Sequence, residues 1–168
     1  TGEASKRVTR RLIERYVAER GDEIVHYLEA ANPSLACELL RVLRYTDHDR
    51  TLAAVRTLSE HADVDVQFEL LRSLEPLPMS TEVARLILRL ATADNEEVRI
   101  RGLALLASRQ ASAAFAPLLT RLKRDAAGRL SDAEAERLGE TLVALAPDEA
   151  LQQFREWCKP KGFFGSVV

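Results

Sequence analysis

The chain of 168 residues has only two cysteines, Cys37 and Cys158. Two cysteines cannot build the disulfide framework that stabilises small secreted domains. Cys37 falls beside the apolar positions of a predicted helix, where we expect a buried free thiol. Helical repeats separate it from Cys158, so we expect no disulfide between the two. Reduced thiols and a polar start without a signal peptide favour a cytoplasmic protein.

Aromatic residues make up only 5% of the chain, so the core must consist mostly of leucine, alanine and valine. No apolar run approaches the roughly 20 residues that a bilayer-spanning helix needs. Lysine and arginine, 24 in all, nearly balance 26 aspartates and glutamates, for a formal net charge of −2. This balance gives no general attraction to nucleic acid or to an acidic membrane.

The sequence also lacks the motifs of common enzymes, since it has no G-x-S-x-G, Walker loop, H-E-x-x-H or C-x-x-C. Its three histidines, His26, His48 and His61, have no second histidine or cysteine at ligand spacing. We therefore expect a non-enzymatic protein with no catalytic residue, metal site or cofactor. We expect Asp49 to cap the helix that follows His48, and His61 to end a helix, where a cationic ring suits the dipole.

What the chain does contain is an internal repeat: Glu38-Leu39-Leu40-Arg41 recurs as Glu69-Leu70-Leu71-Arg72. A period of roughly 30 residues is typical of stacked helical repeats, none of which buries its apolar face alone. Four stretches open with a residue that can cap a helix and continue with apolar residues at helical spacing. The four capping residues are Asn32, Asp63, Asn95 and Ser131, and Ser131 forms a capping box with Glu134.

The apolar spacing predicts which side chains are buried. The first two copies place apolar residues at equivalent positions, namely Leu35, Leu39, Leu40 and Leu43, then Val66, Leu70, Leu71 and Leu74. Another amphipathic helix precedes each copy, the third opened by Ser80, and a last one opens at Pro147. Gly102 and Gly139 fall on apolar faces, where we expect both to admit close helix approach. Pro117 should kink or tighten the start of its helix.

The motif Asp/Asn-x-x-Val/Leu at a helix start, with the apolar spacing behind it, resembles the HEAT-repeat family, especially its bacterial members. The resemblance covers residues 22–158 and implies an all-α, right-handed α–α superhelix of about four helix pairs plus flanking helices. Only Val98-Arg99 keeps the family's Val-Arg, and the first two copies carry Leu-Leu where small residues are common. Armadillo repeats are the nearest alternative, but the loops here leave no room for their third helix.

The resemblance also implies a function, which is a scaffold that binds a protein or peptide on the concave face lined by the second helix of each pair. The candidate partner-binding residues on that face are Ser34, Glu38, Arg41, Gln67, Glu69, Arg72, Arg99 and Arg101. Their mixed charge favours a protein partner. The alternative is a nucleic-acid-binding HEAT-like domain, but the arginine series stops at Ala104 and Glu140. HEAT proteins associated with bilin lyases are a third class, which only Cys158 supports.

We expect residues 1–168 to form a single domain. The two ends of this domain are predicted separately. Residues 5–20 read as a leading helix, and its basic run from Lys6 to Arg15 is interpreted as a solvated face because glutamates interrupt it. Residues 159–168 contain Phe163 and Phe164 and are expected to cap the last repeat, with a docking segment as the alternative. A chain that begins at Thr1 is expected to be a fragment of a longer protein.

Overall fold

The computed structural model describes residues 15, 19–20, 23–28, 31–44, 48–125 and 128–158. This part of the chain is helical throughout and contains no strand, so the all-α prediction is confirmed for it. Residues 23–28 are helical. The elements that follow are α2 (Pro33–Leu43), α3 (His48–Leu58), α4 (Val64–Leu74), α5 (Thr81–Leu90), α6 (Glu96–Ser108), the 3-10 helix η1 (Ser112–Ala114), α7 (Phe115–Asp125), α8 (Asp132–Leu145) and α9 (Pro147–Cys158). Most of the expected leading helix and all of the tail at 159–168 lie outside the described residues.

The helix starts follow the predicted caps. The side chains of Asn32, Asp63, Asn95 and Ser131 each accept a hydrogen bond from a backbone N–H of the first turn of α2, α4, α6 and α8. Ser80 does the same for α5. Each such cap contributes about 1 kcal/mol by satisfying a donor that has no partner within the helix.

Two predictions about the turn residues are wrong. Helix α3 begins at His48, so Asp49 lies inside its first turn rather than at the cap, where its charge still suits the helix dipole. His61 lies beyond the end of α3 at Leu58, and its Nδ1 accepts a hydrogen bond from the backbone N–H of Asp63 at 3.1 Å. The imidazole therefore fixes the turn into α4 and does not complement a helix end.

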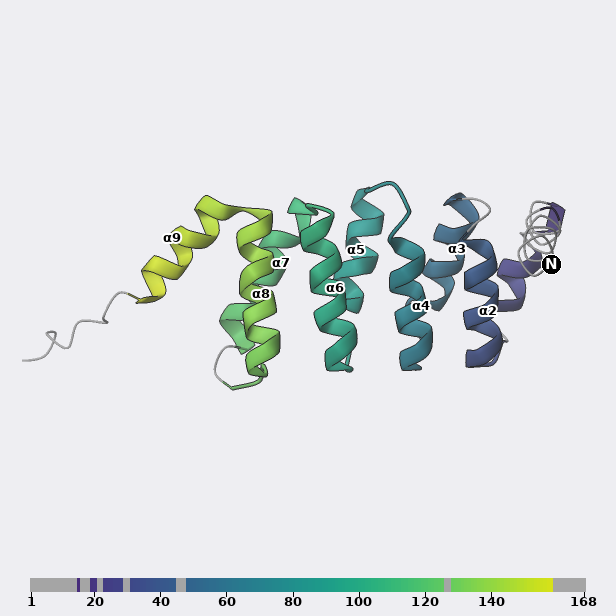
Figure 1. Ribbon diagram of the computed structural model, residues 1–168, viewed down its shortest axis with the longest axis horizontal. Helices are drawn as coiled ribbons and strands as arrows, with labels where there is room; N and C mark the ends of the chain where they lie inside the picture. Colours follow the sequence, from purple (N-terminus) through teal and green to yellow (C-terminus); the bar gives the residue numbers. More distant parts are fainter. Residues whose placement is uncertain are drawn as a thin grey trace, which may run out of the picture.

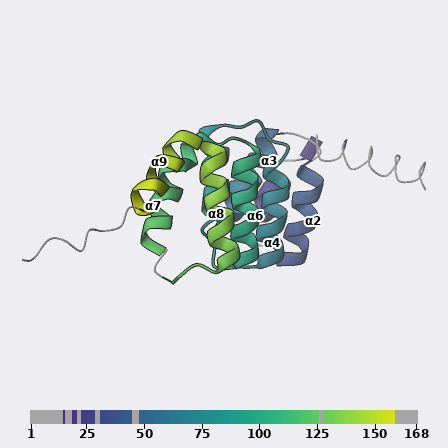
Figure 2. The same ribbon diagram turned by 60° about the vertical axis from the view of Figure 1, so that its left-hand side comes forward.

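The helices stand in two rows (Figures 1 and 2). Helices α2, α4, α6 and α8, the even row, lie side by side, and each packs against the next along the row. Helices α3, α5 and α7, the odd row, lie behind them, and each packs against the even-row helix that follows it. Helix α9 continues from α8 at the end of the row. Packing is mostly between neighbours, while the right-handed HEAT-like superhelix stays a prediction.

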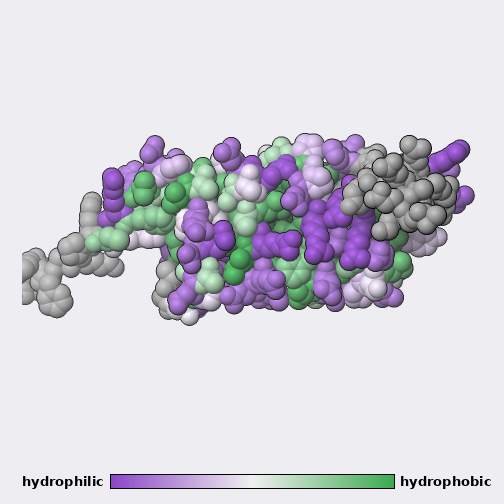
Figure 3. Space-filling model, in the orientation of Figure 1, coloured by the Kyte–Doolittle hydropathy of each residue, from purple (hydrophilic) through white to green (hydrophobic). Residues whose placement is uncertain are grey.

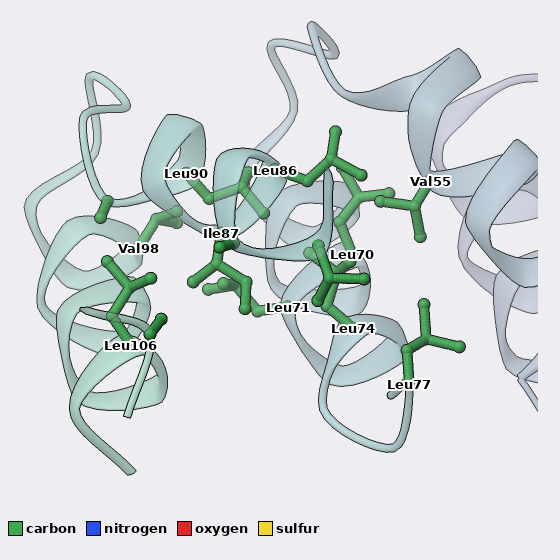
Figure 4. Packing of buried hydrophobic residues seen from close by; sticks show 14 of the residues in the cluster. Val55, Leu70, Leu71, Leu74, Leu77, Leu86, Ile87, Leu90, Val98 and Leu106 are labelled. Carbon is green, nitrogen blue, oxygen red and sulfur yellow. The ribbon is translucent and has the colours of Figure 1, made fainter. Parts of the chain in front are cut away.

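The core lies between the two rows (Figure 4). Leucine, isoleucine and valine side chains of α4, α5 and α6 point toward one another there, among them Leu70, Leu74, Ile87, Val98 and Leu106. All four apolar residues predicted for the second copy are buried, namely Val66, Leu70, Leu71 and Leu74. In the first copy, Leu40 and Leu43 are buried and Leu39 is partly buried, whereas Leu35 is 47% exposed. The inward face of α2 runs through Ala36, Leu40 and Leu43, which leaves Leu35 turned to solvent.

The two glycines on predicted apolar faces differ. Gly102 touches the end of α5, and a Cβ at this position would lie 2.8 Å from the backbone nitrogen of Ala91. The predicted close approach is therefore confirmed for Gly102. It is wrong for Gly139, because no heavy atom lies within 4 Å of a Cβ built there. Pro117 is the third residue of α7, directly after the 3-10 turn η1, so the start of this helix is tightened as predicted.

Candidate interaction surface

The outward face of the even row carries a hollow between α2 and α4, called here the α2–α4 hollow. Its volume is about 470 Å³, and its walls include Ser34, Glu38, Arg41, Asp65, Phe68 and Arg72. Both signs of charge are present, with one aromatic ring between them. Of the predicted surface residues, Ser34, Glu38, Arg41 and Arg72 are thus brought together at one place.

A second hollow, the α4–α6 hollow, adjoins the first. Its volume is about 260 Å³, and its walls include Leu71, Arg72, Glu75, Arg101, Ala104 and Leu105. Arg72 lines both hollows, so the two adjoin at this side chain, and together they are called here the depression across α2, α4 and α6. Figure 3 shows this face, with hydrophilic side chains gathered over its middle and hydrophobic surface between them.

A buried glutamate, Glu69, holds two of the arginines that line the hollows. The Glu69 side chain is only 2% exposed, so its predicted place on the surface is wrong. Its carboxylate accepts hydrogen bonds from Arg41 Nε at 3.3 Å and Arg72 Nη1 at 3.1 Å, and Arg44 donates to it as well. A buried carboxylate requires such partners because desolvation of a lone charge is costly. Glu69 therefore holds Arg41, Arg44 and Arg72 in position and is not itself exposed on the surface.

Ion pairs also form within each of the two helices, although they are only part of the arrangement. Glu38 pairs with Arg41 at 2.5 Å, and Glu69 pairs with Arg72. The hydrogen bond to Glu69 also raises the pKa of Arg41, with the charges of Glu69 and Glu38 adding to the effect. The guanidinium of Arg41 is therefore held between the two helices as a permanent cation.

Arg101 is held differently. Its guanidinium carbon lies 5.7 Å from the centre of the Phe68 ring, within cation–π distance. No carboxylate of the described residues forms a salt bridge with it. Sequence reasoning missed Phe68, whose partly buried ring joins α4 to α6 at this point. The available signal was an aromatic residue three residues after Asp65 and four before Arg72, on the same face of the helix.

The remaining two predicted residues lie outside the hollows. Arg99 is 17% exposed and donates two hydrogen bonds to Glu134, at 2.7 and 2.8 Å. Gln67 is partly buried and donates to the backbone oxygen of His61 at 2.9 Å. Both side chains hold the fold together, so their predicted exposure on the binding face is wrong.

Glu134 is the centre of a second buried ion-pair cluster, formed with Arg99 of α6 and Arg121 of α7. Its side chain is 0% exposed. The predicted capping box is only half formed, because the Ser131 hydroxyl accepts from the Glu134 backbone N–H while the Glu134 carboxylate turns to the arginines. The signal was present in the sequence: Glu134 stands three residues after its cap, where the other copies have Leu35, Val66 and Val98.

The comparisons with protein-family models, with curated proteins and with solved structures found no match. Within the described ranges, no group of three or more His, Cys, Asp or Glu side chains is placed to hold a metal ion. No helix among these residues has the length and apolarity to cross a membrane. What the depression offers is two pockets with charged walls and partly apolar floors.

The two thiols should differ in reactivity. Cys37 is buried beside the α2–α4 hollow, and burial raises the pKa of its thiol, an effect that the nearby Arg41 offsets only in part. Cys158 is exposed. Because the thiolate is the reactive species, we expect a disulfide reagent such as DTNB to modify Cys158 about tenfold or more faster than Cys37. In the Cys158→Ser variant only the slow phase should remain, and two equally fast phases in the native protein would contradict this assignment.

Proposed function

We propose that the chain is a HEAT-like, right-handed solenoid whose even row lines the concave face, and that it serves as a non-enzymatic scaffold for a protein partner. The observation that carries the proposal is the depression across α2, α4 and α6, whose two hollows share Arg72 as a wall residue. A partner segment crossing the helices would contact both hollows at once.

The side chains of the depression are of the kinds that dominate binding energy in protein interfaces. Arginines and aromatic rings are enriched among such residues, and here Arg72, Arg101 and Phe68 are neighbours. Glu69 already holds Arg41 and Arg72, and Phe68 already contacts Arg101. Because these long side chains are held before a partner arrives, binding would cost less conformational entropy.

Nucleic acid is the less favoured partner. A polyanion needs many unpaired cations along its path, whereas Arg41 and Arg72 are paired with Glu38 and Glu69. Farther along the even row, Arg137 is paired with Glu140. Asp65 and Glu75 also line the hollows and would repel phosphates.

The proposal is tested by comparing Arg101→Glu on the depression with Arg85→Glu on α5, since both arginines are exposed and neither forms a salt bridge within the described residues. The immobilised proteins would capture partners from an extract of the source cells, with quantitative mass spectrometry as the readout. We expect one set of proteins to fall about tenfold or more with Arg101→Glu and to be retained with Arg85→Glu.

Two results would contradict the proposal. One is equal capture by both variants, which would place any binding elsewhere on the molecule. The other is capture that disappears when the extract is treated with nuclease, which would indicate nucleic acid as the true ligand. Matching melting curves of the two variants serve as the folding control.

A further inference from the structure

We propose that the α4–α6 hollow recognises an acidic residue beside an apolar residue in an extended segment of the partner. The carboxylate would pair with Arg72 and Arg101, and the apolar side chain would rest on Ala104 and Leu105. This inference rests on the proposed scaffold function and names the chemistry of its partner.

The charge around the hollow is the first support. Arg101 forms no salt bridge with a described carboxylate. Among the described residues, Arg72 pairs with Glu69, a carboxylate that it shares with Arg41 and Arg44. The lining of this hollow holds two arginines, Arg72 and Arg101, and one carboxylate, Glu75, so a partner carboxylate placed at the arginines gains charge-assisted hydrogen bonds.

The apolar wall is the second support. Leu71 is 2% exposed and forms the floor, while Ala104 and Leu105 are partly buried on the α6 side of the same hollow. An apolar side chain that covers this wall removes it from water. Because the arginines and the apolar wall share a hollow of about 260 Å³, the acidic and apolar residues of the ligand must be close together in sequence.

The acidic side chains nearby limit the positions that a ligand carboxylate can occupy. Glu75 follows the end of α4 and lines the same hollow, while Glu38 and Asp65 line the α2–α4 hollow. A ligand carboxylate is repelled from these positions and attracted to Arg72 and Arg101, which line the α4–α6 hollow. A uniformly acidic polymer would meet all three carboxylates, so a short acidic and apolar motif fits this surface better than a polyanion.

The test is selection from a random peptide library displayed on phage, carried out in parallel on the native chain, on Arg101→Gln and on Arg85→Gln. We expect peptides with an acidic residue next to a leucine-like residue to be enriched on the native chain and on Arg85→Gln. The same enrichment should disappear on Arg101→Gln. The enriched peptide, synthesised with a fluorescent label, should bind Arg101→Gln and Arg72→Gln about tenfold or more weakly than the native chain.

The outcomes separate this inference from the scaffold function. If peptides are enriched but bind Arg101→Gln equally well, or carry basic residues instead, the inference is wrong while the scaffold function stands. If no peptide is enriched on any of the three proteins, the inference is wrong, and the capture experiment with Arg101→Glu and Arg85→Glu decides the scaffold function separately. If heparin binds the native chain at physiological salt and displaces the labelled peptide, the arginines take phosphate or sulfate groups, and the motif proposed here is wrong.

Discussion

Replacing Gly102 with alanine should lower the free energy of unfolding by about 1–3 kcal/mol, although alanine is the better helix former. A Cβ at this position would lie 2.8 Å from the nitrogen of Ala91 and 2.9 Å from its Cα. Both are backbone atoms of the residue that ends α5, so no side-chain rotation relieves the contact. Helices α5 and α6 would have to move apart, which opens the core between them.

Gly139 supplies the matched control, because it also lies within an α-helix and a Cβ there meets nothing within 4 Å. Gly139→Ala should therefore raise the free energy of unfolding by up to about 1 kcal/mol. Urea denaturation of both variants measures the two effects. Changes of the same sign at the two positions would contradict the packing described for Gly102.

Replacing Glu134 with glutamine should lower the free energy of unfolding by about 3–5 kcal/mol, because it leaves two arginines of a buried cluster without their carboxylate. Arg99 and Arg121 both donate to this carboxylate, and Arg121 also donates to the backbone oxygen of Ala91. Glutamine keeps the shape of the side chain but not its charge. Glu140→Gln on the same helix removes an exposed partner of Arg137 and should change stability by less than about 1 kcal/mol.

The same cluster predicts how stability depends on pH. Burial alone would raise the pKa of Glu134, but the hydrogen bond from Arg99 and the charge of Arg121 outweigh it and hold the pKa below its ordinary value of 4.5. A depressed folded-state pKa stabilises the protein above the ordinary pKa, and this contribution is lost as the pH falls through the folded value. The stability difference between the native chain and Glu134→Gln should therefore be constant near neutral pH and shrink below about pH 4.5. A difference that persists unchanged into acid would contradict the ion-pair assignment.

Local chemistry explains what could be predicted from the sequence. Asn32, Asp63 and Asn95 bond to N–H groups two or three residues away, so a helix start is readable from a short stretch of chain. The periodic apolar residues of α4 are all buried for the same reason, since their spacing alone places them on one face.

The wrong predictions concern residues whose burial and contacts depend on a second helix. Glu69 bonds to Arg41, 28 residues away, and Glu134 bonds to Arg99, 35 residues away, so neither burial is visible in a local pattern. Gly102 and Gly139 looked equivalent in sequence, but only Gly102 has another helix end against it. At the candidate site, Arg72 and Arg101 were predicted, whereas the hollow that joins them depends on how α4 and α6 pack.

The buried carboxylate of Glu134 also means that the helices of the even row are not interchangeable parts. A chimaera in which the α4 sequence replaced α8 would bring Val66 to the place of Glu134 and leave Arg99 and Arg121 facing an apolar side chain. The reverse exchange would place a glutamate where α4 buries Val66, and the residue of α2 that corresponds to Arg99 is Ala36. The helices of the even row therefore share their caps and apolar spacing, but their buried charged residues differ. These charged residues favour one order of the helices along the row.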